Sequence, residues 1–154
     1  MNGYVIDASV AVKWLVDEAY SKEADALLTS GSMFIAPSLV FAESVNALWA
    51  MHQRGDISGQ DLSDAVDTLL AAPITLPVSM PQLSAAAARL ASDLGHPAYD
   101  CFYLALAIQS QYPVVTADTR FHDRVRIHPY LADRIVHLAE AVTRTPGPRD
   151  SGPS

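Results

Sequence analysis

The sequence contains few of the residues on which several common kinds of site depend. Its 154 residues include a single cysteine, Cys101, which excludes an internal disulfide framework and a zinc site built from thiolates. No apolar run reaches the roughly 18 residues that predict a membrane-spanning helix. The amino-terminus has no basic region before its apolar stretch and reaches Asp7 at once, which argues against a signal peptide. We therefore expect a soluble, cytoplasmic protein without a membrane segment.

Basic residues are also scarce. Only 10 lysines and arginines stand against 17 aspartates and glutamates, so the formal net charge is −7 at pH 7. Proteins that bind nucleic acids usually carry a basic surface, and this balance therefore lowers the expectation of an RNA partner. It does not exclude one, because bound divalent cations reverse the local sign of an acidic site, and a basic patch can lie within an acidic total.

The chain is long enough for one domain, and half of its residues are hydrophobic. Short apolar runs predict strands at 4–6, 33–36, 75–78, 114–117 and 134–138. Helical patterns occur at 11–16, 22–28, 38–53, 58–71, 82–94 and 100–111. Strands separated by helices indicate an α/β fold with a central, mostly parallel sheet flanked by helices. We expect one domain over 1–142 and a disordered tail over 143–154, where Pro, Gly and Ser accumulate.

Four of the acidic residues lie among apolar neighbours. Asp7 and Asp118 directly follow predicted strands, and ligands bind beyond the carboxyl ends of strands in such sheets. Glu43 lies in an apolar helix that we expect to be buried nearly all round, and Asp100 precedes another helix without a clear polar face. A buried carboxylate needs a partner, and only Lys13 is near the strand-end acids in sequence. Converging carboxylates therefore indicate a Mg²⁺ or Mn²⁺ site.

Each acid also has a purely structural interpretation. Asp7 and Asp100 are suited to capping the helices that follow them, where a negative charge is favourable. Asp118 is equally suited to a turn. Glu43 has no capping role in the middle of its helix, so its expected burial points most directly to function.

Four segments that contain these acids occur in the order of the motifs of a known family. They read VIDASVAVKWL, PSLVFAESVNAL, HPAYDCFYLALA and VVTADTRF. Together they resemble the motifs of PIN-domain nucleases, and more narrowly those of the VapC toxins of bacterial toxin–antitoxin pairs. The resemblance extends over nearly all of the chain except the tail. It implies a PIN-like fold in which Asp7, Glu43, Asp100 and Asp118 are catalytic residues and metal ligands.

The resemblance also implies roles for residues near these acids. Ser9 matches the small polar residue after the first acid, Asn46 the asparagine one turn after the glutamate, and Thr116 the hydroxyl before the last acid. We expect them to orient the carboxylates, although the hydroxyls of Ser9 and Thr116 are equally suited to satisfying nearby backbone groups. Some members carry a further acid after the fourth. Here Asp123 lies several residues beyond that position, which leaves its role as a ligand open.

The implied activity is Mg²⁺-dependent hydrolysis of RNA, with Mn²⁺ as a substitute. The resemblance further implies the toxin of a type II toxin–antitoxin system, a homodimer that a cognate antitoxin protein silences. Lys13, Arg120, Arg124 and Arg126 are the candidates for contacts with RNA phosphates. The pair Phe121-His122, which Arg120 and Arg124 flank, either stacks on a base or lies in a solvated loop. The five histidines are scattered without the spacing of a zinc site.

Three other functions remain open at this point. A receiver domain of a response regulator also places acids at strand ends around Mg²⁺, but it needs a lysine after a late strand, and Lys13 and Lys22 are the only lysines. A PIN-like module that only binds a protein partner is expected to lack one of the acids, and all four are present. A nuclease directed at DNA would use the same acids, and the sequence does not separate it from a ribonuclease.

Overall fold

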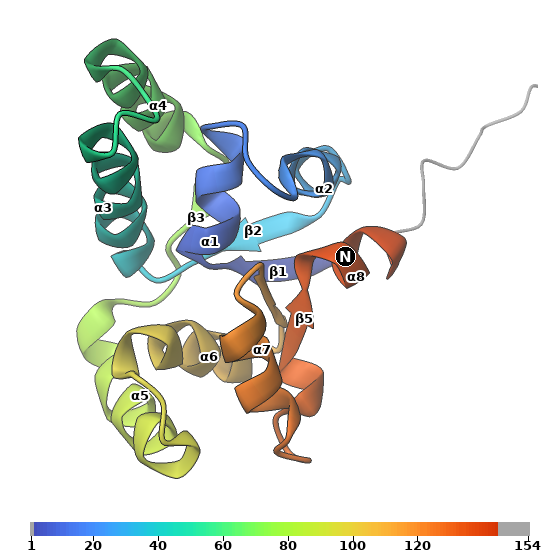
Figure 1. Cartoon of the computed structure of the whole chain (residues 1–154). Coiled ribbons are helices and arrows are strands. Elements are labelled where there is room, and N and C mark those ends of the chain that lie inside the picture. The colour runs from blue at the N-terminus through green and yellow to red at the C-terminus, as the bar shows by residue number, and fades with distance from the viewer. Residues whose placement is uncertain (1, 145–154) are drawn as a thin grey trace, which may run out of the picture.

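One parallel sheet of five strands forms the centre of the computed structural model, which describes residues 2–144 (Figure 1). The strands are β1 (Gly3–Ile6), β2 (Met33–Ile35), β3 (Ile74–Thr75), β4 (Val114–Thr116) and β5 (Ile135–His137). Their order is β3-β2-β1-β4-β5, and every pairing is parallel. Parallel neighbours require a crossover connection, and a helix lies in each of the four connections.

Eight α-helices surround this sheet in the described part of the chain. They are α1 (Ala8–Ala11), α2 (Ser21–Leu28), α3 (Leu39–Gln53), α4 (Gly59–Ala71), α5 (Met80–Leu94), α6 (Ala98–Ser110), α7 (Thr119–Arg126) and α8 (Leu138–Arg144). Two short 3₁₀ helices, η1 (Val12–Trp14) and η2 (Ala132–Arg134), complete the set. The predicted α/β fold with a parallel sheet is confirmed. Among the described residues, no helix is long and apolar enough to cross a membrane.

Several boundaries differ from the predicted ones for local reasons. The first helix begins at Ala8 rather than 11, because Asp7 caps it directly after β1. The third strand is Ile74–Thr75 rather than 75–78, since Pro77 has no N–H to donate to a sheet. Helix α7 was not predicted, because Phe121 and Val125 are its only buried residues and lie among polar ones.

The predicted carboxyl-terminal boundary at residue 142 falls inside a helix. Helix α8 extends to Arg144, two residues beyond the predicted end at 142. The remaining positions of the predicted tail, 145–154, lie outside the described residues. The disorder of that tail therefore stays a prediction.

Helix α3 is less buried than its sequence predicts. We expected it to be buried nearly all round, but its fully buried residues are Val40, Ser44 and Leu48, which follow one another at intervals of four. This face packs against α1 and α4. Val45 and Trp49 lie on the exposed side, and 52% of Trp49 is accessible. The prediction was wrong because only the face of α3 with Val40, Ser44 and Leu48 is fully buried.

The sheet topology predicts where a ligand binds. From β1 the chain adds β2 and β3 on one side, and β4 and β5 extend on the other. In open parallel sheets, ligands bind outside the carboxyl ends of the strands at such a switch point. Here that point lies between β1 and β4. Receiver domains have the order 2-1-3-4-5, so the observed order excludes that alternative.

Candidate active site at the carboxyl edge of the sheet

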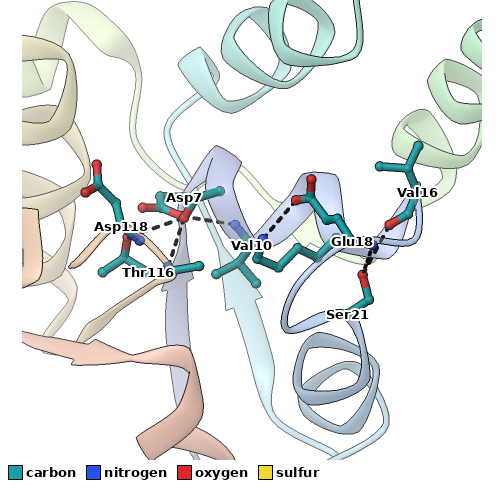
Figure 2. A network of polar contacts seen from close by, with 10 residues as sticks. Asp7, Val10, Val16, Glu18, Ser21, Thr116 and Asp118 are labelled. Atoms are coloured by element: carbon teal, nitrogen blue, oxygen red, sulfur yellow. Dashed lines mark hydrogen bonds and ion pairs between the residues drawn. The ribbon is translucent and has the colours of Figure 1, made fainter. Parts of the chain in front are cut away.

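Asp7 lies at the switch point, directly after the buried strand β1. Its side chain is almost fully buried, with 5% of the residue accessible. Oδ1 accepts a hydrogen bond from Ser9 Oγ at 2.5 Å and another from the Val10 N–H at 3.2 Å (Figure 2). Asp7 is therefore both the N-cap of α1 and a buried acid held in one orientation.

Burial raises the pKa of Asp7 to about 6, because a carboxylate loses its hydration inside the protein. Hydrogen bonds from Ser9, Thr116 and the Val10 backbone oppose this effect, and the charge of Asp100 adds to it. Without a cation, the fold thus holds Asp7 in an environment that disfavours its charged form. A group of this kind at the edge of a sheet is typical of a functional site.

Glu43 approaches the same edge from helix α3 and is half-buried. Tyr103 of α6 donates a hydrogen bond to Glu43 Oε1 at 2.6 Å. Burial raises the pKa of Glu43, the Tyr103 bond lowers it, and the charge of Asp100 raises it again. Burial, followed by the contact with Glu43, also raises the pKa of Tyr103 far above its usual range, so Tyr103 remains a hydrogen-bond donor. The sequence analysis had not selected Tyr103, although it follows Asp100 by three residues on the same helix.

Asp100 lies in the first turn of α6, where its charge suits the helix dipole. The cap itself is Pro97, so the predicted capping role of Asp100 is replaced by a position inside the helix. Asp100 Oδ2 lies 2.6 Å from His96 Nε2, and the His96 ring stacks on Phe121 with centroids 5.2 Å apart. We had treated all histidines as scattered. The four-residue spacing of His96 and Asp100 was the signal that could have identified this pair.

Three carboxylates interact through their charges and are here called the acid cluster: Asp7 after β1, Glu43 on α3 and Asp100 on α6. The charge of Asp100 raises the pKa of both Asp7 and Glu43, which places Asp100 within electrostatic reach of each of the other two. Lys13, the nearest lysine in sequence, instead forms an ion pair with Glu18 at 2.8 Å. Within residues 2–144, no ion pair joins the cluster to a lysine or arginine.

Asp118 is placed differently from the cluster. It is exposed and caps α7, with Oδ1 accepting a hydrogen bond from the Phe121 N–H at 3.2 Å. Ser9 and Thr116 connect its turn to that of Asp7. The Ala117 N–H donates to Ser9 Oγ at 2.9 Å, the Asp118 N–H donates to Thr116 Oγ1 at 3.0 Å, and the two hydroxyls are 3.3 Å apart. Figure 2 shows Thr116 and Asp118 beside Asp7. The Ser9 hydroxyl thus orients the Asp7 carboxylate, and both hydroxyls also accept hydrogen bonds from backbone N–H groups.

The donor chemistry of these residues fits a hard divalent cation. All four acids offer carboxylate oxygens, and hydrogen bonds from Tyr103 and His96 fix one oxygen of Glu43 and one of Asp100. Asp7 is buried without a lysine or arginine partner among residues 2–144, which fits the same interpretation. In the described part of the chain, however, no group of three or more His, Cys, Asp or Glu side chains stands in position to hold a metal ion. The metal-ligand set therefore stays a proposal.

The remaining residues selected from the sequence are spread around the cluster. Asn46 is exposed and lines the same surface hollow as Glu43. Arg120 and Arg124 are exposed on α7, and Lys13 is largely buried in its ion pair. Asp123 is exposed on α7, and its Oδ1 lies 3.0 Å from His122 Nδ1, so Asp123 contacts this histidine rather than the acid cluster.

Comparison with known proteins identifies the fold and the family. The PIN-domain family model matches residues 4–127. A crystal structure of PAE2754 from Pyrobaculum aerophilum superposes with a TM-score of 0.70 at 21% identity, over 94% of this chain and 89% of that one. VapBC2 from Rickettsia felis, bound to a DNA fragment from its promoter, gives a TM-score of 0.59 at 14% identity, over 88% and 98%. No curated protein sequence matches the chain. The family match covers most of the chain and includes all four acids, so the protein belongs to the PIN-domain family of nucleases.

Proposed function

We propose that this protein is a metal-dependent endoribonuclease that acts as the toxin of a type II toxin–antitoxin system in the cytoplasm. The observation that carries the proposal is the acid cluster beside the switch point, in which the charge of Asp100 acts on both Asp7 and Glu43 and no lysine or arginine among the described residues is paired to any of the three. Such a cluster suits the binding of Mg²⁺ or Mn²⁺ beside a phosphodiester.

Asp7, Glu43, Asp100 and Asp118 would hold the cation. When bound, Mg²⁺ or Mn²⁺ supplies a nucleophilic water and neutralises charge on the phosphate and the leaving oxygen. The chain's own contribution is orientation: Ser9 holds Asp7, and Thr116 holds the backbone of Asp118. Tyr103 and His96 fix Glu43 and Asp100 in the same way. Such outer contacts determine how a carboxylate points.

RNA would approach along helix α7. Arg120 and Arg124 are exposed there, in the first and second turns of the helix that Asp118 caps. They are suited to contact phosphates on either side of the cut. Lys13 contributes less to RNA binding, because its ammonium group already forms an ion pair with Glu18. A cation in the acid cluster would offset part of the net charge of −7 where RNA binds.

An antitoxin protein and a second copy of the chain are the expected protein partners. The family resemblance is the basis for both, and the neighbouring VapBC2 structure is consistent with an antitoxin. Val45 and Trp49 expose apolar surface on α3 that an antitoxin helix or a second protomer would cover. Co-expression with a short reading frame found next to the gene, followed by size-exclusion chromatography with light scattering, tests both partners. A lone monomer in the presence of that product would contradict this part of the proposal.

Cleavage of matched single-stranded RNA and DNA oligonucleotides, with Mg²⁺, Mn²⁺ or EDTA, tests the nuclease. We expect metal-dependent cleavage of RNA and little cleavage of DNA. Asp100→Asn should abolish cleavage, whereas Asp123→Asn is the matched control, because Asp123 is an exposed acid whose contact is with His122. Preferential cleavage of DNA would indicate a DNA-directed nuclease. A folded protein that cuts neither would indicate a protein-binding module.

A further inference from the structure

A hollow beside the acid cluster has no role in the chemistry described so far. Its volume is about 350 Å³, and it is lined by Leu39, Ala42, Glu43, Asn46, Ala47 and Tyr99. Tyr99 belongs to α6 and the other lining residues belong to α3, so the hollow lies between these two helices. Glu43 belongs both to the hollow and to the acid cluster. A ligand in this hollow would therefore lie next to the reacting phosphate.

Tyr99 is the aromatic residue among those that line the hollow. It directly precedes Asp100 in the first turn of α6, and 65% of its surface is accessible. It belongs to neither hydrophobic cluster found within residues 2–144. A helix thus presents an aromatic ring to solvent beside a site acid without using that ring for packing.

The other groups around the hollow suit a flat heterocycle. Leu39, Ala42 and Ala47 offer apolar contacts, and the exposed amide of Asn46 can both donate and accept hydrogen bonds. Proteins recognise unstacked bases of single-stranded RNA with an aromatic face for stacking and polar groups for the base edge. The hollow contains both features next to Glu43.

We propose that this hollow binds one nucleobase of a single-stranded RNA substrate next to the scissile phosphate, with Tyr99 stacking on the base and Asn46 contacting its edge. The subsite rests on the proposed nuclease function, because the acid cluster is what would hold the phosphate there. A side chain of a protein partner is the other class of occupant. The nucleobase is favoured because Glu43 joins the hollow to the acids, whereas the apolar Val45 and Trp49 lie outside its lining.

The test combines variants of Tyr99 with RNA substrates that lack one base at a time. Tyr99→Ala should raise KM about 10-fold at unchanged kcat, which is ~1.4 kcal/mol and within the range for stacking of a base on an aromatic ring. Tyr99→Trp should keep most of the affinity. Tyr130→Ala is the matched control, because Tyr130 is 95% exposed and lies outside the hollow. An abasic nucleotide at the stacked position should weaken binding to wild type but not to Tyr99→Ala.

Each contrary result has its own meaning. Equal KM values for wild type and Tyr99→Ala would overturn the subsite. So would an abasic nucleotide that weakens binding to Tyr99→Ala as much as binding to wild type. Neither result would contradict the proposed nuclease. If wild type cuts no RNA, the nuclease proposal fails, and fluorescence anisotropy with the same RNA decides the subsite: equal affinities overturn it. If Tyr99→Ala changes the oligomeric state while RNA binding is unchanged, the hollow is a protein contact, which also overturns the proposal.

Discussion

The turns after β1 and β4 have the same local design but different surroundings. In each, an aspartate beyond a buried strand caps the next helix, and both capping bonds, from the Val10 and Phe121 N–H groups, measure 3.2 Å. Yet Asp7 is buried, whereas Asp118 is exposed. The helices that pack nearby explain the difference, because α3 contacts α1 and α6 contacts β1. Capping therefore accounts for where both acids are, and only burial makes one of them unfavourable to ionise.

The largest expected difference between the two turns is in catalysis. Asp7→Asn should lower the rate of RNA cleavage by more than about 100-fold, since even the loss of an outer partner of a metal ligand costs about 10–100-fold. Asp118→Asn should lower it by a smaller factor, because this exposed side chain is held less firmly. Single-turnover cleavage with Mn²⁺ measures both. Equal losses would show that the two acids act as one unit despite their different burial.

The second difference is in the stability of the metal-free protein. Folding raises the pKa of Asp7 from 3.8 to about 6 and so favours its protonated form. The stability that this protonation contributes is present in full below about pH 4 and is lost as the pH rises through about 6. Removing this charge in Asp7→Asn should stabilise the protein above pH 7 by up to about 3 kcal/mol. Asp118→Ala should instead destabilise it by about 1 kcal/mol through loss of the cap.

Urea unfolding in EDTA at pH 4 and pH 7.5 measures both variants against wild type. The advantage of Asp7→Asn should disappear at pH 4. A variant that is less stable than wild type at both pH values would show that Asp7 is a structural partner rather than a strained acid.

The third difference concerns the pH dependence of metal binding. A cation must displace the proton of Asp7, so Mn²⁺ affinity should fall by up to about tenfold per pH unit below about pH 6. The fall should remain in Asp118→Asn and become smaller in Asp7→Asn, where the raised pKa of Glu43 is left. The shift of the melting temperature with Mn²⁺ concentration reports the affinity. A pH dependence as steep in Asp7→Asn as in wild type would assign the proton to another group.

The smallest effect concerns Ser9, which joins the two turns. Ser9→Ala removes the donor to Asp7 and the acceptor of the Ala117 N–H, and we expect a loss of about 1–3 kcal/mol because a partly buried N–H is left without a partner. It should also raise the pKa of Asp7 further, since the Ser9 bond lowers it. Unfolding of Ser9→Ala at pH 7.5, with Ser84→Ala on the exposed face of α5 as the control, measures the effect. A neutral Ser9→Ala would show that the turns hold without this hydroxyl.

The local pattern of the sequence determined most of the fold. Each of the five predicted strands overlaps an observed one, because an apolar run bounded by turn residues is a local signal. The segment Thr119–Arg126 could not be assigned in this way. Its two apolar anchors, Phe121 and Val125, define a helix only once β4 and β5 are present to pack against.

The sequence by itself selected the four acids, because each interrupts an apolar stretch where a charge is unfavourable. Only the tertiary structure decided that the charge of Asp100 acts on both Asp7 and Glu43 and that Asp118 is exposed. It also paired Tyr103 with Glu43 across 60 positions of the chain. Desolvation and Coulomb interactions depend on distances through space and on the atoms that replace water, and neither can be read from the order of residues along the chain.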